Sequence, residues 1–307
     1  TNSSNGLITG YPGIYCNQSE SIYELYTDGD FLYVGTNCHG IYFSSDNGEN
    51  WQQMNEGIPM ETRTRVYDIS SNNERIYAMT DKGVYYSTNT GQNWQLDDRL
   101  PFDGENIDIN KSNLCIPNQK NIYISKDNGT NWDIINQKLS IPSFSYNNFI
   151  TSDSNYFYIA DGNYGMYKLS NIDTVRKQFS YGLTQRHAKY LYKEDSILIS
   201  ATECGGLYYS NNLGDDWKII NNLLVNIKIN SIVKFDTLLI AATDSGIYCS
   251  SDKGIQWKKD LSFSEVNVNS IISYNDSLLA GTNNGIYIGK LGYWNKLNSE
   301  ISDNQIN

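Results

Sequence analysis

Several residue types are scarce in this chain of 307 residues, and each shortage excludes a class of protein. Lysine and arginine together number 23 against 34 aspartates and glutamates, which gives a net charge of -11. Phosphate backbones are bound mainly by basic side chains that release counterions, so nucleic acid is not expected as a partner. No apolar run approaches the roughly 18 to 20 residues of a membrane-spanning helix, so membrane insertion is not expected either.

Histidine and cysteine are too few and too scattered for a recognisable metal site. The chain has two histidines and five cysteines, namely His39, His187, Cys16, Cys38, Cys115, Cys204 and Cys249. They form no CxxC pair, and the chain has no Gly-rich phosphate loop, so neither a metal ion nor a cofactor is expected. Most cysteines should be small buried residues, and Cys16 and Cys38 could pair in an oxidising compartment.

A repeat of about 40 residues organises the sequence. Its signature, glycine followed by a hydrophobic residue and tyrosine, ends at Tyr42, Tyr85, Tyr167, Tyr208, Tyr248 and Tyr287, and Asn121-Ile122-Tyr123 fills the gap. Successive tyrosines are 43, 38, 44, 41, 40 and 39 residues apart, the length of a four-stranded propeller blade. Short alternating segments rich in valine, isoleucine and tyrosine predict strands, and no sustained helical period occurs. We therefore expect an all-β propeller in one domain over 1–307.

The most specific motif is Ser-x-Asp-x-Gly-x-x-Trp, which lies between the third and fourth strands of a repeat. It occurs three times with aspartate and twice with asparagine, around Asp46 and Trp51, Asn89 and Trp94, Asp127 and Trp132, Asn212 and Trp217, and Asp252 and Trp257. The aspartate or asparagine side chain is expected to accept backbone N–H groups of its own turn, and glycine to supply a positive φ. The tryptophan should be buried between neighbouring elements. The motif is thus predicted to be structural.

These motifs resemble the Asp-box (BNR) repeats of sialidases, sortilin-type receptors, xyloglucan-degrading glycosidases and photosystem II assembly factors. The resemblance covers roughly residues 22 to 298 and implies a propeller with non-catalytic boxes on the outer rim. The likeness to the assembly factors rests on the boxes alone, because no concentrated arginine patch is visible, and the acidic balance favours other relatives.

Seven blades are the first expectation, with boundaries near 22–58, 64–101, 105–140, 147–183, 188–224, 229–262 and 268–298. The box is degenerate in the fourth blade, which retains Ser170 and Asp173, and the seventh is two residues short before Trp294. The ends, 1–21 and 299–307, resemble parts of a blade and are expected to close the ring. An eighth blade shared by the two ends is the alternative.

Two function classes remain open. A sialidase-like, glycan-active hydrolase would need an arginine triad, and Arg63, Arg99 and Arg186 fall in connections that open on one face of a propeller. The other class, which we favour, is a non-enzymatic binding or scaffolding module for a protein or glycan, with recognition in loops on that face. The candidate ligand-binding residues are His39, Arg63, Arg65, Arg99, Tyr164, Tyr181, Arg186 and His187.

The chain begins at Thr1 with a polar segment, which is consistent with removal of a signal peptide. A secreted, periplasmic or cell-surface location is therefore expected. The oligomeric state and the identity of the ligand cannot be deduced from composition or motifs.

Overall fold

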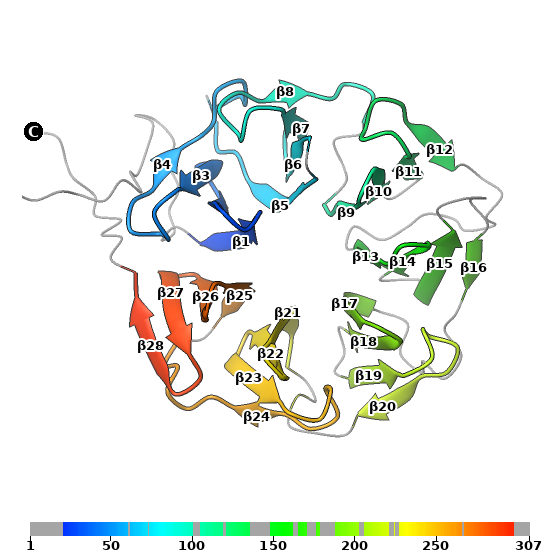
Figure 1. Cartoon of the computed structure of the whole chain (residues 1–307), viewed down its shortest axis with the longest axis vertical. Coiled ribbons are helices and arrows are strands. Elements are labelled where there is room, and N and C mark those ends of the chain that lie inside the picture. Colours follow the sequence, from blue (N-terminus) through cyan, green and yellow to red (C-terminus); the bar gives the residue numbers. More distant parts are fainter. Residues whose placement is uncertain are drawn as a thin grey trace, which may run out of the picture.

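The computed structural model describes residues 21–60, 62–72, 74–100, 105–118, 121–135, 148–161, 165–170, 176–178, 188–202, 206–220, 224, 227–265 and 267–297. These residues form seven antiparallel sheets of four strands and no helix, which confirms the expected all-β propeller with seven blades. Figure 1 shows the sheets as a ring around a central axis. The predicted closing segments, apart from Ser21, lie outside the described residues, so their part in closing the ring stays a prediction.

In every blade the chain passes from the innermost strand to the outermost. Blades one to three contain β1 (Ile22–Thr27), β2 (Leu32–Thr36), β3 (Ile41–Ser44), β4 (Gln52–Gln53); β5 (Val66–Ser71), β6 (Ile76–Thr80), β7 (Gly83–Ser87), β8 (Gln95–Leu96); and β9 (Asp108–Asn110), β10 (Asn113–Pro117), β11 (Ile122–Ser125), β12 (Asp133–Ile135). Blades four and five contain β13 (Asn148–Ser152), β14 (Tyr156–Asp161), β15 (Gly165–Ser170), β16 (Arg176–Gln178); and β17 (Ala188–Glu194), β18 (Ile197–Thr202), β19 (Gly206–Ser210), β20 (Lys218–Ile220). Blades six and seven contain β21 (Ile229–Phe235), β22 (Leu238–Thr243), β23 (Gly246–Ser250), β24 (Lys258–Lys259); and β25 (Val268–Tyr274), β26 (Ser277–Thr282), β27 (Gly285–Lys290), β28 (Tyr293–Lys296).

The glycine and tyrosine of the repeat signature have separate structural roles. At the start of β23, Gly246 has a φ of 108°, a conformation that glycine adopts without strain, and its carbonyl accepts the Thr243 hydroxyl at 2.7 Å. The tyrosine two residues later points into the layer between blades; Tyr42 is fully buried and Tyr248 is 6% exposed. The signature therefore marks a tight turn followed by a core position.

The hydrophobic core lies between blades, and it closes the ring. Residues of blades one and two form one cluster, which includes Tyr33, Ile41, Ile69 and Trp94. Blade seven packs against blade one in the same way, through a cluster that includes Tyr274. Figure 1 shows β25 beside β1. Within the described chain, closure thus rests on face-to-face packing of two complete blades.

Each of the five Asp boxes forms the same turn. In the first, Ser44 Oγ donates to Asp46 Oδ1 (2.9 Å) and accepts the Gly48 N–H (2.9 Å), while Asp46 Oδ1 accepts the Asn50 N–H (2.8 Å). The other four boxes repeat these three bonds. The glycine has positive φ, as predicted, and so does the residue before it, with values of 84° and 61° at Gly48 and Asn47.

The box tryptophans link successive blades. Trp94 is 3% exposed, and its Nε1 donates to the Met54 carbonyl of the preceding blade at 2.8 Å. In the shortened seventh blade, Trp294 Nε1 reaches Asp260 Oδ2 at 2.8 Å across the same kind of seam. In the fourth blade β15 and β16 still pair, and Asp173 lies outside the described residues. The blade therefore tolerates loss of the consensus motif.

Candidate functional site

A β-bulge recurs near the start of the inner strand in five blades. The pairing register shifts between Ile22 and Glu24 in β1 and between Val66 and Asp68 in β5, and β17, β21 and β25 have the same irregularity. A bulge leaves one residue unpaired and re-aims its side chain, and bulges are frequent beside functional sites. The skipped residues are Tyr23, Tyr67, Lys189, Asn230 and Asn269.

Four of these five bulge residues line a cavity at the mouth of the central channel. Its volume is about 270 Å³, and its lining includes a residue from the start of the inner strand, or from the segment leading into it, of six different blades. We call this set the mouth ring; its members are Tyr23, Tyr67, Glu105, Phe149, Asn230 and Asn269. Glu24, Asn106, Lys228 and Ile229 complete the lining. Because residues of six blades can meet only around the axis, this cavity is a place where most of the ring contributes to one site.

Arg65 is the predicted site residue that the structure brings to the mouth ring. Its guanidinium carbon lies 5.3 Å from the ring centroid of Tyr23 and 5.8 Å from that of Tyr67, a cation–π arrangement. Its Nε donates to Asn37 Oδ1 at 2.7 Å. Arg65 therefore joins the aromatic side of the mouth to the turn between β2 and β3.

Three carboxyl groups lie next to the mouth, on the inner strands and in electrostatic contact with one another. Burial and the charge of Asp68 raise the pKa of Glu24 well above its usual value. Burial, together with the charge of Asp108, raises the pKa of Asp68 to about 7, and burial raises that of Asp108 to about 6. The channel therefore becomes more negative as the pH rises through neutrality.

Polar side chains of the inner strands also hold neighbouring blades together. Asp68 Oδ2 accepts the Ile107 N–H at 2.8 Å, from the next blade. Tyr190 Oη likewise accepts the Ile232 N–H, and Ser270 Oγ accepts the Leu25 N–H, whereas Ser231 Oγ donates to the Ile271 carbonyl. We call these four contacts the blade ties. Asp68 is thus both part of the acidic channel and a structural link.

His39 and Arg99 lie elsewhere than expected. His39 is 4% exposed rather than an exposed loop residue, and its N–H and carbonyl bond Thr36 Oγ1 and Asn55 Nδ2. Arg99 pairs with Asp97 at 2.6 Å and donates to the Gly129 and Thr130 carbonyls in the third box. Its guanidinium is therefore engaged at a seam between blades on the rim, which does not support an arginine triad with Arg99 as a member.

The remaining candidates are not brought together by the described structure. Arg63 is exposed in the connection between β4 and β5. Tyr164, Tyr181, Arg186 and His187 lie outside the described residues. No group of three or more histidine, cysteine, aspartate or glutamate side chains in the described chain is placed to hold a metal ion, and no helix there could cross a membrane.

The described cysteines are of two kinds. Cys38, which is 7% exposed, is disulfide-bonded, whereas Cys115 and Cys249 are free. Burial raises the pKa of both free thiols, so neither is an activated nucleophile. Cys16, the predicted partner of Cys38, lies outside the described residues, and this pairing stays a prediction.

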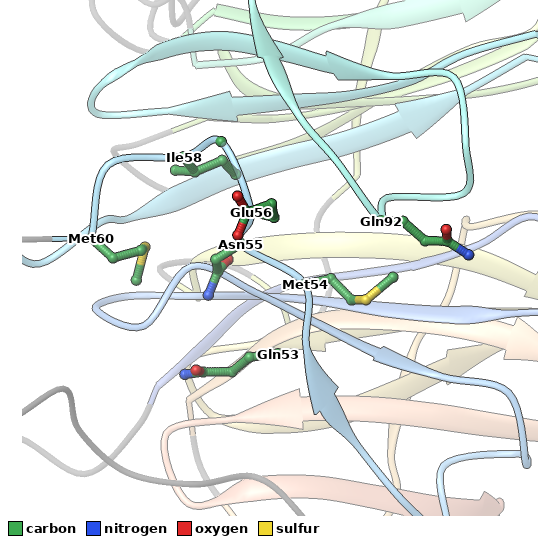
Figure 2. Close-up of a pocket in the computed structure, with 8 residues that line it drawn as sticks. Gln53, Met54, Asn55, Glu56, Ile58, Met60 and Gln92 are labelled. Carbon is green, nitrogen blue, oxygen red and sulfur yellow. The ribbon is translucent and has the colours of Figure 1, made fainter.

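Two larger cavities lie between blades one and two. The one in Figure 2 has a volume of about 490 Å³ and is lined by Met54, Ile58, Met60 and Gln92 among others. Its Asn55 side chain accepts the Ile41 N–H at 2.8 Å and donates to the His39 carbonyl, and the Glu56 carbonyl accepts the Trp94 N–H. The other, of about 500 Å³, includes Asp28 and Arg75. Each involves one seam, so neither has the convergence seen at the mouth.

Sequence reasoning missed the mouth ring, although a signal for it exists. When the repeats are aligned, Tyr23, Tyr67, Asn230 and Asn269 each follow the first apolar residue of an inner strand. In a regular strand this position would face a neighbouring blade, and the bulge changes that orientation. The alignment could have located the position, but the bulge is visible only in the structure.

Comparisons with known proteins place the chain among propellers of this type. The structure is similar to the extracellular domain of a protein described as a one component system from B. thetaiotaomicron, with 16% identity and a TM-score of 0.73 over 90% of this chain and 39% of that one. It is also similar to YCF48 from Cyanidioschyzon merolae, with 15% identity and a TM-score of 0.67 over 90% of this chain and 96% of that one. At these identities the likeness shows the fold.

A third solved structure is YCF48 bound to a D1 peptide, with 16% identity and a TM-score of 0.69 over 90% of this chain and 94% of that one. No curated protein matches the chain at a significant level of sequence similarity. The model of one sequence family matches residues 23–297, so the likeness to the assembly factors extends well beyond the boxes. The chain belongs to the family described as photosynthesis system II assembly factor YCF48, with BNR-type repeats.

Proposed function

We propose that this chain is a protein-binding propeller that holds an extended segment of a partner protein at the channel mouth. The observation that carries the proposal is the mouth ring, in which six blades contribute side chains to one cavity of about 270 Å³. Convergent aromatic and polar side chains in a preformed cavity are typical of recognition sites. The D1 peptide bound by YCF48 supports a protein segment as the ligand.

The mouth ring offers contacts suited to a polypeptide. Tyr23, 37% exposed, and Tyr67 present amphipathic rings that contact side chains at little entropic cost, as in other protein interfaces. Asn230 and Asn269 are fixed by hydrogen bonds from their Nδ2 atoms to the Val268 and Ile22 carbonyls, both at 2.8 Å. A rigid site loses less conformational entropy when it binds.

Alanine variants of the ring test the proposal. Tyr23→Ala and Tyr67→Ala should each weaken co-purification of a partner that the wild-type protein captures, by about tenfold or more in Kd, because aromatic anchors dominate interface energies. Tyr293→Ala is the matched control, since Tyr293 is 66% exposed on the outermost strand β28 and should leave binding unchanged. Folding is checked by thermal unfolding. Unchanged binding by both folded ring variants would refute the proposal.

We propose in addition that the chain works outside the cytoplasm. The support is the disulfide at Cys38, because structural disulfides persist mainly in oxidising compartments. A count of free thiols in the unreduced protein tests this proposed location.

A further inference from the structure

The mouth cavity has the size and the aromatic faces suited to a single side chain. Its volume of about 270 Å³ lies below the roughly 300–1,000 Å³ of sites for drug-sized ligands. Tyr23, Tyr67 and Phe149 contribute aromatic rings to it. Aromatic faces attract cations through their quadrupole, and Arg65 already occupies such a position over Tyr23 and Tyr67. The aromatic rings of this side therefore suit a cation, and Arg65 beside two of them already supplies one positive charge.

The opposite side of the mouth presents hydrogen-bond acceptors. Backbone carbonyls only accept, so the bonds to Val268 and Ile22 oblige Asn230 and Asn269 to turn their nitrogens toward the next blade. The second N–H of Asn269 is also engaged, by Asn283 Oδ1 at 2.9 Å. The Oδ1 atoms of both amides, together with one N–H of Asn230, are then left for a ligand, and a donor such as an ammonium or guanidinium group suits the two oxygens.

The acidic groups at the site also favour a positively charged ligand. Glu24 and Glu105 line the cavity, with Lys228 as the ammonium group in the lining. Asp68 and Asp108 add carboxyl groups next to it, and Asp108 Oδ2 is enclosed with no hydrogen-bond donor within reach in the described structure. A cation at the mouth would favour ionisation of all of these acids, whereas an anion would oppose it.

We propose that the mouth cavity binds the side chain of a lysine or arginine in an extended segment of the partner. The inference rests on the proposed function and specifies the chemistry of that site. Tyr23, Tyr67 and Phe149 surround the aliphatic stem and the charge, Asn230 and Asn269 accept from it, and Glu24 and Glu105 neutralise it. Lys228 and the nearby Arg65 oppose the ligand, because like charges repel.

Peptide binding to the whole chain tests the proposal. The probes are fluorescein-labelled Gly-Gly-Ser-Lys-Ser-Gly-Gly and counterparts with arginine, norleucine or glutamate in place of lysine, measured by fluorescence anisotropy at pH 7.5. The lysine and arginine peptides should bind about tenfold or more tighter than the norleucine peptide, and the glutamate peptide should be weakest.

Two charge variants give opposite expected shifts. Glu105→Gln should weaken the lysine peptide by about threefold or more, and Lys228→Met should tighten it by a similar factor. Glu49→Gln and Lys258→Met are the matched controls, because both residues are exposed on the outer part of their blades and should change nothing. Each variant is compared after its melting temperature has been shown to match that of the wild type.

The outcomes separate this inference from the function on which it rests. Equal affinity for the lysine and norleucine peptides, or weaker binding of the lysine peptide by Lys228→Met, would overturn the cation proposal. If the ring alanine variants lose the partner in that case, protein binding at the mouth stands and only its chemistry is wrong. If those variants keep the partner, the proposed function itself fails.

Discussion

At the scale of single residues, the same polar side chains stabilise the ring and set the charge of the channel. Asp68 links two blades through the Ile107 N–H, yet burial keeps its carboxyl group largely protonated below neutral pH. Cys38 likewise lies in a turn whose backbone bonds Thr64, and it carries a disulfide. The described carboxyl and sulfur groups that could react or ionise are thus mostly engaged in structural contacts, except at the mouth.

The disulfide at Cys38 gives a thiol count that can be measured. In denaturant without reductant, an alkylating reagent should label at most three of the five cysteines, and all five after reduction, because one disulfide removes two thiols. Peptide mapping should place Cys38 in the cross-link, and Cys16 is its predicted partner. The control Cys249→Ser should lower both counts by one. Five labelled thiols in unreduced protein isolated from its native compartment would contradict the proposed location.

At the scale of elements, the inner strands carry the site and the outer turns carry the motif. The blade ties connect four pairs of neighbouring blades, while the Asp boxes close the outer hairpins. Five inner strands contain bulges, and the bulge residues of four of them, Tyr23, Tyr67, Asn230 and Asn269, line the mouth cavity. The proposed recognition site therefore lies at the inner edges of the blades, and the repeat motif lies at their outer edges.

A blade tie makes stability depend on pH. Between the ordinary carboxyl pKa near 4 and the value of about 7 for folded Asp68, the folded chain holds a proton that the unfolded chain has released. The free energy of unfolding should therefore fall as the pH rises through this window, by at most about 1.4 kcal/mol per pH unit for this group.

Asp68→Asn tests that dependence, because asparagine can still accept the Ile107 N–H and cannot ionise. Urea unfolding between pH 4.5 and 7.5 should show a shallower decline for the variant, with equal or greater stability at pH 7. The exposed Asp98→Asn should follow the wild type. An identical pH profile for Asp68→Asn and the wild type would mean that this carboxyl titrates in the same range in both states.

Local motifs predicted the fold well, and they predicted the site poorly. The boxes are local turns, so Asp46, Gly48 and Trp51 specify their own geometry and mark each blade. The mouth ring depends instead on six distant segments and on bulges, which no short motif encodes. Arg65 was a candidate for its place in a connection, whereas Arg99 in the same class of connection turned to Asp97. The hydrogen-bond and ion-pair partners near an arginine therefore decide where its side chain lies.

At the scale of the whole molecule, six of the seven blades bring residues toward a common axis, and the cavity at the mouth results from their convergence. The chain carries a net charge of -11, which favours association with basic partners through long-range attraction. The rim is occupied by boxes and tryptophans that link blades. We therefore assign partner binding to the axis, whereas the contacts that stabilise the ring lie on the inner strands, between the blades and on the perimeter.

Site-specific photo-crosslinking in the cells of origin tests this assignment most directly. A benzophenone amino acid replaces Tyr67 or Phe149 at the mouth, or Tyr293 on the outer strand, in otherwise intact chains. The account predicts a discrete crosslinked partner from positions 67 and 149 and none from position 293. A partner captured from position 293, with no product from either mouth position, would contradict it.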